Sequence, residues 1–447
     1  MKHAKPINRR KRQKKILNIL LVLLVIAIVV AAETIYRDYQ ARPGFLEKIW
    51  IEERGSDYIT VAWEKPRNVY RFVVTYNGKV RHVPGVHSSV KLTDLEENTD
   101  YKISVRADSR SRQGFETLSE SARTKNNQSI EGPKEQMKFA NVPVDLKQTA
   151  ETDISYTSDN KHMVVTDGKV KFTRPGKYLV TAKAEETNDY AEETETIKVT
   201  VLDTVNADVD EATPHVFYKL NRKNCELVRT VKGVKEGVTP QSFVHNNGEY
   251  VVLYSVSGNK TQRIIKFGKK KTVIKPKANL GHCNGLTIAD GRYYMVKGGS
   301  PDGVSFNLTS DYKPFRLPNN AAGIAYDESN EMFYTAQHMV IASYDKDLNE
   351  LNTFNRIHRN YRNYSQDCGA YKGIMMHCVS GSDFQGTNYI DFYDMLNWKY
   401  IGSIECQLNE VESLIVDDDG YIQLLCNTKK SEDNIWKTPI NMKMLTE

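Results

Sequence analysis

Residues 282–298 read HCNGLTIADGRYYMVKG. A polar residue opens a short hydrophobic strand, Asp290-Gly291 forms a tight turn, and a second hydrophobic strand follows. Four other stretches share this pattern: PQSFVHNNGEYVVLYSV (240–256), AAGIAYDESNEMFYTAQ (321–337), SQDCGAYKGIMMHCVSG (365–381) and EVESLIVDDDGYIQLLC (410–426). The five stretches therefore indicate a repeated β-sheet unit.

The spacing of this unit predicts the fold of residues 212–447. When the stretches are aligned on the turn, steps of 43, 39, 43 and 46 residues separate the equivalent positions Gln241, Asn284, Gly323, Gln366 and Glu412. A regular period near forty with four strands per unit is typical of a β-propeller. We predict five blades. Six blades are the alternative, if the hairpin VFYKLNRKNCELVRTV (216–231) forms a partial blade of its own.

The two ends of this region are complementary. The last repeat has only a short outer strand, IWKTP (435–439), and the hairpin at 216–231 precedes the first full repeat. We expect the N-terminal strands to complete the C-terminal blade, which closes the ring without a free strand edge.

The N-terminal segment predicts a membrane anchor. The first fifteen residues carry eight Lys and Arg and no acid, and residues 16–32, ILNILLVLLVIAIVVAA, are apolar except for Asn18. We predict a basic cytoplasmic tail (1–15), an uncleaved signal-anchor helix (16–32), a linker (33–43) and an extracellular body of a single-pass membrane protein. A signal peptide cleaved after Val30-Ala31-Ala32 is the alternative. The net charge is +6, so the body is nearly neutral, which argues against a nucleic-acid partner.

Two β-sandwiches are expected between the anchor and the propeller. Residues 44–125 contain alternating strands, with Trp63 in ITVAWEKP and with Leu95 and Tyr101 in LTDLEENTDYKISVRA. This segment resembles a fibronectin type III module, in which the Trp fills the space between the sheets and the Tyr forms a corner.

Residues 130–203 contain SYTSDN, then DGKV (167–170), then PGKYLVTA (175–182) and a closing alternating strand. This segment resembles a bacterial Ig-like domain of group 2, a module that implies a spacer or adhesive unit on a bacterial surface. The phrase LGHCNGLTIADGRYYMV (280–296) resembles surface propellers found beside such repeats in Gram-positive bacteria, a family of unknown activity. The expected fold is therefore all-β after one transmembrane helix.

A candidate ligand site is expected where the innermost strands begin. Polar side chains converging at a channel mouth are a usual form of binding site, and we expect them to be partly hydrated. The candidates are Gln241, His282, Asn284, Gln366, Asp367, Glu410 and Glu412. Gly323 lacks a side chain at the equivalent place, which would open the rim on that side. The alternative is that these groups only join neighbouring blades.

The sequence shows no motif that identifies an enzyme. It has no GxSxG, HExxH or Walker motif and no evident Ser–His pairing, and no catalytic residue, metal site or cofactor is predicted. A zinc site would need His282, Glu410 and Glu412 to converge, which spacing does not show. All six cysteines lie after residue 224; disulfides and buried thiols are both open.

We expect a cell-surface binding or adhesion protein rather than an enzyme. The sandwiches would present the propeller, and its ligand would be a glycan, peptide, protein or envelope polymer outside the cell. The alternative is an exported propeller enzyme of the glycan lyase, lactonase or cyclase type. Its site would lie at the channel mouth around His282, Asn284 and Glu412.

Overall fold

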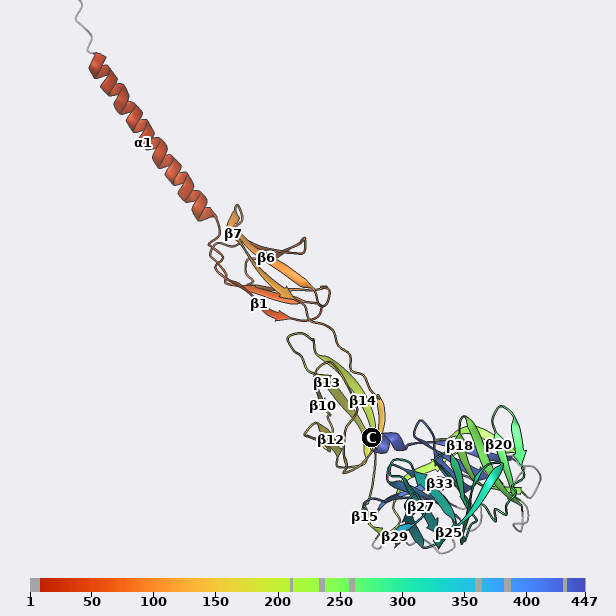
Figure 1. Cartoon of the computed structure of the whole chain (residues 1–447). Coiled ribbons are helices and arrows are strands. Elements are labelled where there is room, and N and C mark those ends of the chain that lie inside the picture. The colour runs from red at the N-terminus through yellow and green to blue at the C-terminus, as the bar shows by residue number, and fades with distance from the viewer. Residues whose placement is uncertain are drawn as a thin grey trace, which may run out of the picture. The chain divides into compact units, whose positions relative to one another are not determined.

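The computed structural model is all-β after one N-terminal helix (Figure 1). It describes residues 9–209, 212–232, 238–256, 262–357, 364–381, 387–428 and 432–446. The first eight residues of the expected basic tail lie outside this range. The chain divides into two compact units: one holds residues up to Glu131 together with Gln148–Ser155 and Ala182–Glu195, and the other holds the rest.

Helix α1 (Arg9–Ala41) contains a stretch that is long and apolar enough to cross a membrane. Its mean hydropathy is 2.9 in the most apolar window, none of which is buried in the protein. Residues 33–41 of the expected linker continue the helix. Glu33–Arg37 and Asp38–Arg42 ion pairs, at 2.6 and 3.0 Å, join successive turns and support the helix after the apolar run ends.

The first sandwich has two sheets that pack around one core. One is β1-β2-β5 and the other β4-β3-β6-β7, with bounds β1 (Ile49–Arg54), β2 (Ile59–Trp63), β3 (Arg71–Tyr76), β4 (Lys79–Pro84), β5 (Ser89–Leu92), β6 (Asp100–Asp108) and β7 (Gln113–Arg123). Trp63 is buried against Phe72, with ring centroids 4.7 Å apart. The Tyr101 hydroxyl accepts a hydrogen bond from the Glu96 N–H at 2.8 Å, so Tyr101 forms the expected corner.

The second module also has two sheets. They are β10-β13-β14-β8 and β11-β12-β9, with bounds β8 (Glu135–Phe139), β9 (Pro143–Val144), β10 (Ile154–Thr157), β11 (Met163–Thr166), β12 (Lys169–Phe172), β13 (Gly176–Ala184) and β14 (Glu193–Leu202). The Asp167-Gly168 turn connects β11 to β12, as its sequence predicts. The resemblance to a group 2 Ig-like domain stays a prediction.

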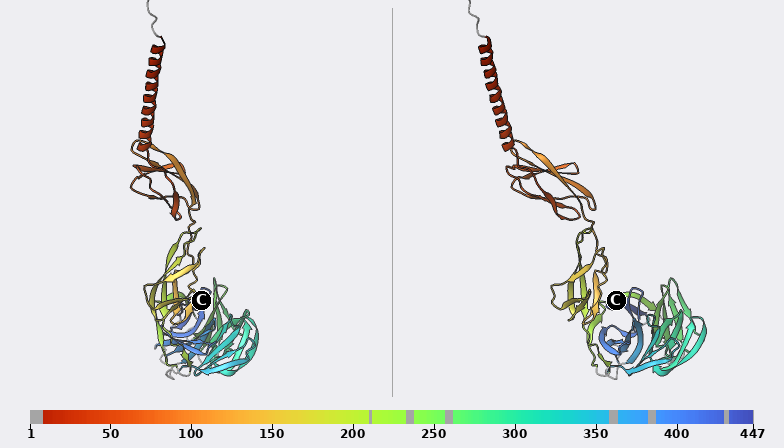
Figure 2. Two further views of the ribbon diagram at one scale, coloured as in Figure 1. Left: turned by 90° about the vertical axis from the view of Figure 1, so that its left-hand side faces the viewer. Right: turned by 60° about the vertical axis from the view of Figure 1, so that its left-hand side comes forward.

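Five sheets of at least four strands follow, each with its innermost strand first. They are β18-β19-β20-β21, β22-β23-β24-β25, β26-β27-β28-β29, β30-β31-β32-β33 and β34-β35-β36-β17. The innermost strands are β18 (Val238–Asn246), β22 (Gly285–Ala289), β26 (Gly323–Asp327), β30 (Tyr364–Tyr371) and β34 (Glu410–Val416). Each contacts the next in this order, and β34 contacts β18, so the sheets form a closed, propeller-like ring (Figure 2).

The outer strands of these sheets complete the ring. Second strands are β19 (Glu249–Val256), β23 (Arg292–Val296), β27 (Met332–Gln337), β31 (Ile374–Ser380) and β35 (Tyr421–Asn427). Third and fourth strands are β20 (Gln262–Phe267), β21 (Lys271–Ile274), β24 (Ser300–Asn307), β25 (Ser310–Ala321), β28 (Val340–Tyr344), β29 (Glu350–Asn355), β32 (Asn388–Asp394), β33 (Lys399–Gln407) and β36 (Glu432–Asn441). A short helix, α2 (Met442–Thr446), ends the described chain and contacts β8.

The N-terminal hairpin of the ring is shared between two sheets. Strand β17 (Glu226–Lys232) pairs antiparallel with β36 and completes the last sheet. Strand β16 (Val216–Asn221) pairs instead with β33, parallel, beside the short strand β15 (Ala207–Asp208). The expectation that both hairpin strands complete the C-terminal blade is therefore right for β17 and wrong for β16. Among the described residues the hairpin forms no sheet of its own, which favours the five-blade prediction over six.

Deleting residues 215–231 should destabilise the ring, because it removes β17 and exposes the hydrogen-bonding edge of β36. We expect the deleted full-length chain to aggregate in detergent, measured by light scattering, and to melt at a lower temperature. A soluble deletion variant with an unchanged melting temperature would contradict closure through β17.

Candidate functional site

The predicted site residues lie at the beginning of the innermost strands, but most are buried. Gln241, Asn284, Gln366, Asp367, Glu410 and Glu412 are each at most 7 % exposed, whereas His282 is exposed. The expectation of a partly hydrated rim is therefore wrong for all of them except His282. The backbone N–H of His282 donates to the Lys297 carbonyl at 2.9 Å.

β-Bulges orient several of these side chains. The register of the innermost strand with its neighbour is interrupted between Pro240 and Ser242 in β18, between Ser365 and Cys368 in β30, and between Val411 and Ser413 in β34. The interruptions contain Gln241, Gln366 with Asp367, and Glu412. Because an extra residue in a strand turns its side chain out of the regular alternation, bulges are common beside functional sites.

Asp367 joins all five innermost strands. Its carboxylate accepts hydrogen bonds from Ser413 Oγ (2.7 Å), from the backbone N–H groups of Cys368 (2.8 Å) and Ile324 (3.3 Å), and from the backbone of Leu286. Ser413 Oγ in turn accepts from the Phe243 N–H of β18 at 3.4 Å. A carboxylate has about four acceptor sites. All are used here, so Asp367 has a structural role and is not free to bind a ligand.

Gly285 and Gly323 allow this close approach. A Cβ on Gly323 would lie 2.5 Å from the Cys368 backbone nitrogen, and one on Gly285 would lie 2.6 Å from the Ile324 nitrogen. Real Cβ atoms do not approach backbone so closely. Gly323 therefore lets β26 pack against β30 and does not open a gap in the rim, as its lack of a side chain had suggested.

Two amide side chains form one polar group of the site. Asn284 Nδ2 donates to Gln366 Oε1 at 3.2 Å, and Gln366 Nε2 donates to Ser380 Oγ at 3.1 Å. Asn284 Oδ1 is buried and has no hydrogen-bond partner among the residues that the structure describes. Gly298 lies directly beside it, since a Cβ there would be 2.6 Å from Asn284 Oδ1.

Gln241 provides a second unused acceptor. Its Nε2 donates to Thr239 Oγ1 (3.1 Å) and to the Pro240 carbonyl (2.9 Å), while its buried Oε1 has no partner in the described part of the chain. The next residue connects this strand to the Asn284 segment, because Ser242 Oγ donates to the Cys283 carbonyl at 2.8 Å. A buried acceptor without a donor is costly, so each of these oxygens is a candidate contact for a ligand or water.

A pair of buried carboxyl groups completes the site. Asn427 Nδ2 donates to Glu412 Oε1 at 2.9 Å and to Glu410 Oε2 at 3.2 Å. Burial, then the nearby charge of Glu410, holds the pKa of Glu412 well above its usual range. Each carboxylate disfavours ionisation of the other, so this pair holds a proton more readily than an isolated carboxyl does. The pair can therefore both donate and accept hydrogen bonds.

Asp433 of β36 adds a third carboxyl near this pair. It is 2 % exposed and contributes to the raised pKa of Glu412. Burial raises the pKa of Asp433 itself to about 7, although the Thr428 N–H donates to it at 3.3 Å. Among the residues that the structure describes, no group of three or more His, Cys, Asp and Glu is arranged to hold a metal ion.

The structure reveals a Ser–His contact that the sequence did not indicate. Ser365 Oγ lies 2.6 Å from His377 Nε2, between β30 and β31. His377 faces Asp391 across the strands, and Asp391 accepts from Ser403 Oγ at 2.6 Å. His377, Asp391 and Ser403 are fully buried inside one sheet, so this row is a packed polar connection rather than an accessible nucleophile. In the sequence, this row is visible as one polar residue in each of four successive strands, at 365, 377, 391 and 403.

The six cysteines are free thiols. Five are buried and Cys225 is partly buried, and burial raises the pKa of all six. They therefore behave as small apolar residues of the strands.

Asp367→Ala should unfold or strongly destabilise the ring, because it leaves Ser413 Oγ and several buried N–H groups without an acceptor. Each such loss costs about 1–3 kcal/mol. We expect chemical denaturation to show a free energy of unfolding lowered by at least about 3 kcal/mol. The exposed Asp418→Ala, in the turn that follows the strand of Ser413, should change it by less than about 0.5 kcal/mol. Equal stability of the two variants would contradict the role of Asp367.

Asp433→Asn should stabilise the protein at pH 8 and not at pH 4. The carboxyl ionises near 3.8 in the unfolded chain and near 7 in the folded one, so the folded state binds more protons between these values. Stability therefore falls as the pH rises from about 4 to about 7. At about 1.4 kcal/mol per pKa unit, we expect a gain of a few kcal/mol at pH 8. Melting curves across this range test it; an equal effect at both pH values would exclude titration of Asp433.

Comparison with known proteins supports the first sandwich. Residues 47–125 match the family model described as Fibronectin type III domain, whereas no curated protein matches the chain. Among solved structures, a Myxococcus xanthus glutaminyl cyclase is similar at 10 % identity and a TM-score of 0.38, over 51 % of this chain and all of that one.

Two fibronectin type III structures are also similar, each over 19 % of this chain with a TM-score of 0.17. One is the fn3 domain of human collagen alpha-1(XX), at 27 % identity over 83 % of that chain, and the other is FN3tt mut, at 13 % over 99 %. These scores are too low to support an argument about function. Together with Trp63 and the Tyr101 corner, the family match identifies residues 47–125 as a fibronectin type III domain.

Proposed function

We propose that this chain is a membrane-anchored binding protein of the cell surface, with its N-terminus in the cytoplasm and its body outside the cell. The apolar helix and the fibronectin type III domain support the location. Eight basic residues before the helix support the orientation. The propeller-like ring carries the binding site, and the second module is a group 2 Ig-like spacer.

The ligand is a neutral molecule rich in amide or hydroxyl groups, such as a peptide or glycan. The main support is the pair of unused acceptors, Gln241 Oε1 and Asn284 Oδ1, in the same part of the ring as the carboxyl pair. Amide and hydroxyl donors would fill these acceptors, and the proton shared by Glu410 and Glu412 would be offered to a ligand carbonyl. An anionic ligand would meet a second negative charge in a buried place, which is unfavourable.

The second candidate is an exported enzyme of the cyclase type. Its support is the raised pKa of Glu412, since a carboxyl whose pKa lies above its usual range holds a proton more readily and can serve in acid–base chemistry. The Ser365–His377 contact does not support a hydrolase, because it is enclosed within a sheet.

The test uses the full chain in detergent with two probes: tetra-N-acetylchitotetraose and a short peptide with an N-terminal glutamine. Calorimetry should show binding of at least one. Asn284→Ala and Gln241→Ala should each weaken it about tenfold or more, which corresponds to about 1.4 kcal/mol. Gln407→Ala, an exposed change on the outer strand β33, is the matched control.

Ammonia release from the glutamine peptide would favour the cyclase alternative over binding alone. Unchanged affinity in both site variants, with a melting temperature equal to that of the control, would exclude this end of the ring as the binding site. Glu412→Ala is unsuitable as a binding test, because the side chain is buried and its loss should also lower stability.

A further inference from the structure

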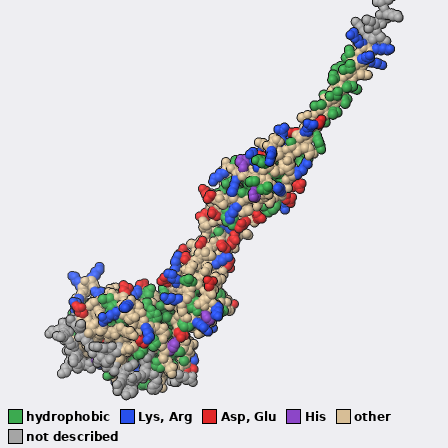
Figure 3. Space-filling view, turned by 180° about the vertical axis from the view of Figure 1, so that it is seen from behind, with side chains coloured by type: hydrophobic (Ala, Val, Ile, Leu, Met, Phe, Trp, Pro, Cys, Tyr) green, Lys and Arg blue, Asp and Glu red, His purple; other side chains and the backbone are tan. Residues whose placement is uncertain are grey.

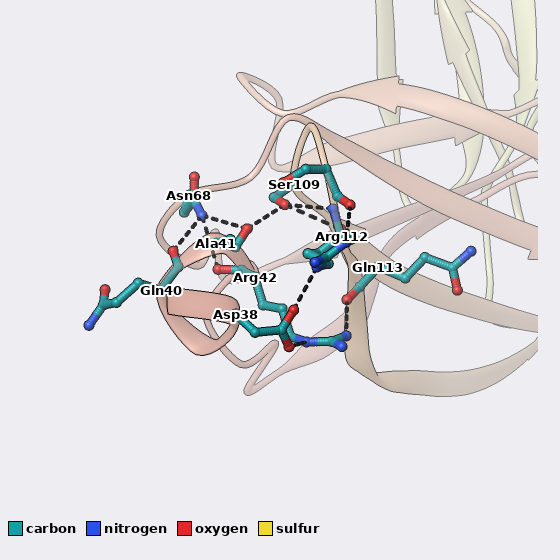
Figure 4. A network of polar contacts seen from close by, with 9 residues as sticks. Asp38, Gln40, Ala41, Arg42, Asn68, Ser109, Arg112 and Gln113 are labelled. Carbon is teal, nitrogen blue, oxygen red and sulfur yellow. Dashed lines mark hydrogen bonds and ion pairs between the residues drawn. The ribbon is translucent and has the colours of Figure 1, made fainter. Parts of the chain in front are cut away.

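The fibronectin type III domain holds the C-terminal end of α1 through hydrogen bonds. Asn68 Nδ2 lies 3.2, 3.2 and 3.0 Å from the carbonyl oxygens of Gln40, Ala41 and Arg42, and Ser109 Oγ donates to the Ala41 carbonyl at 2.6 Å (Figure 4). The last carbonyls of a helix have no partner within the helix. The domain supplies these partners, so the helix continues directly into a folded surface.

Ion pairs strengthen this junction. Asp38 of α1 lies 3.0 Å from Arg42 Nε and 2.6 Å from Arg112 Nε, and the Arg42 guanidinium also donates to the Gln113 carbonyl at 3.0 Å (Figure 4). The final turn of the helix is thereby fixed to the loop between β6 and β7. The end of the domain at which α1 enters therefore keeps a defined position on the helix.

This end of the domain lies close to any membrane that α1 crosses. The apolar run ends at Ala32 and the helix ends at Ala41. Residues 33–41 span roughly 13 Å at about 1.5 Å per residue. The headgroup layer takes about 5–8 Å of that length. The distance that remains between the headgroup layer and the domain is about one Debye length at physiological salt, roughly 8 Å. This holds for either orientation of the chain in the membrane.

Three loops form the surface at this end, here called the helix-proximal surface: residues 64–70, 84–88 and 108–112. Backbone hydrogen bonds hold them together, from Tyr70 N–H to the Asp108 carbonyl (2.9 Å) and from Gly85 N–H to the Tyr70 carbonyl (2.8 Å). The surface exposes apolar side chains that a soluble domain would normally cover: Tyr70 is 54 % exposed and Val86 is 75 % exposed.

Arginines accompany these aromatic rings. The Arg110 guanidinium lies 5.3 Å from the Tyr70 ring, and the Arg67 guanidinium lies 5.7 Å from the ring of Tyr39 on α1. Tyr and Arg side chains favour the interface between lipid and water, because each has an apolar part and a polar end. The surface therefore has the composition of a membrane-interface belt.

The helix-proximal surface also carries an excess of positive charge. Lys65, Arg67 and Arg110 form no ion pair with any described residue, and Asp38 and Asp108 are each shared by two arginines. The exposed Glu47 and Glu64 reduce this charge without cancelling it. Acidic residues lie at the other end of the domain, in and beside the loops that follow β1 and β5: Glu53, Asp57, Asp94, Glu96 and Glu97. Figure 3 shows acidic and basic side chains spread over the surface of the chain.

We propose that the helix-proximal surface binds the headgroups of anionic phospholipids in the membrane that α1 spans. Lys65, Arg67 and Arg110 contact the phosphate layer, and Tyr70 and Val86 rest against it. The proposal is independent of the ring and its ligand. It requires only that α1 crosses the bilayer. The domain would then rest against the membrane surface instead of moving freely above it.

The test uses the full chain in nanodiscs of phosphatidylcholine, with and without phosphatidylglycerol. Hydrogen exchange of residues 64–70 and 108–112 should be at least about fivefold slower in the anionic discs, which corresponds to about one basic residue near an anionic surface. High salt should remove the difference, because these charges are exposed to solvent. Equal exchange in both lipids would overturn the proposal.

Charge reversal at matched positions supplies the control. Lys65→Glu with Arg110→Glu should abolish the slowing in anionic discs. Lys79→Glu with Lys102→Glu changes the net charge equally, but at the opposite end of β3 and β6, and should leave the slowing intact. An equal effect of both pairs would also overturn the proposal. Fast hydrogen exchange in β3 and β6 would show that a variant has unfolded. In that case the salt dependence of exchange in the unaltered chain tests whether the surface binds anionic lipid.

Discussion

The ring depends on one buried carboxylate. Asp367 lies where the five innermost strands approach, and it is fully buried, which alone would be strongly unfavourable for a charge. Burial holds the pKa of Asp367 well above its usual range, and four donors from its own and neighbouring strands offset only part of this cost. Ser413 extends the connection to Phe243 of β18. The same approach excludes any side chain at Gly285 and Gly323. The position of every sheet around the axis is therefore tied to these contacts.

Much of the fold could be predicted because periodic signals lie within single segments. The repeat spacing indicated the ring, and Trp63 and Tyr101 indicated the first sandwich. The helix boundary was missed because Glu33 ends the apolar run without ending the helix, which its ion pair with Arg37 supports. The register of β16 was missed because pairing between distant strands leaves no local pattern.

The positions of the candidate residues along the innermost strands could be predicted, but their surroundings could not. Sequence spacing places Gln241, Gln366 and Glu412 at equivalent positions, yet it cannot show the bulges that turn them inward. The bulge of Gln366 also contains Asp367, whose side chain connects the innermost strands instead of facing a ligand. Whether two neighbouring polar residues face a ligand or another strand depends on this local register, which only the three-dimensional structure shows.

The carboxyl groups beside the site argue for a function more strongly than their number alone. Burial raises the pKa values of Asp367, Glu412 and Asp433, and the nearby charges of Glu410 and Asp433 raise the pKa of Glu412 further. At neutral pH such a group lowers the stability of the very sheet that closes the ring through β17. Apolar residues of similar size would avoid this cost. This cost falls beside the unfilled acceptors of Gln241 and Asn284, which supports the proposal of a site at this end of the ring.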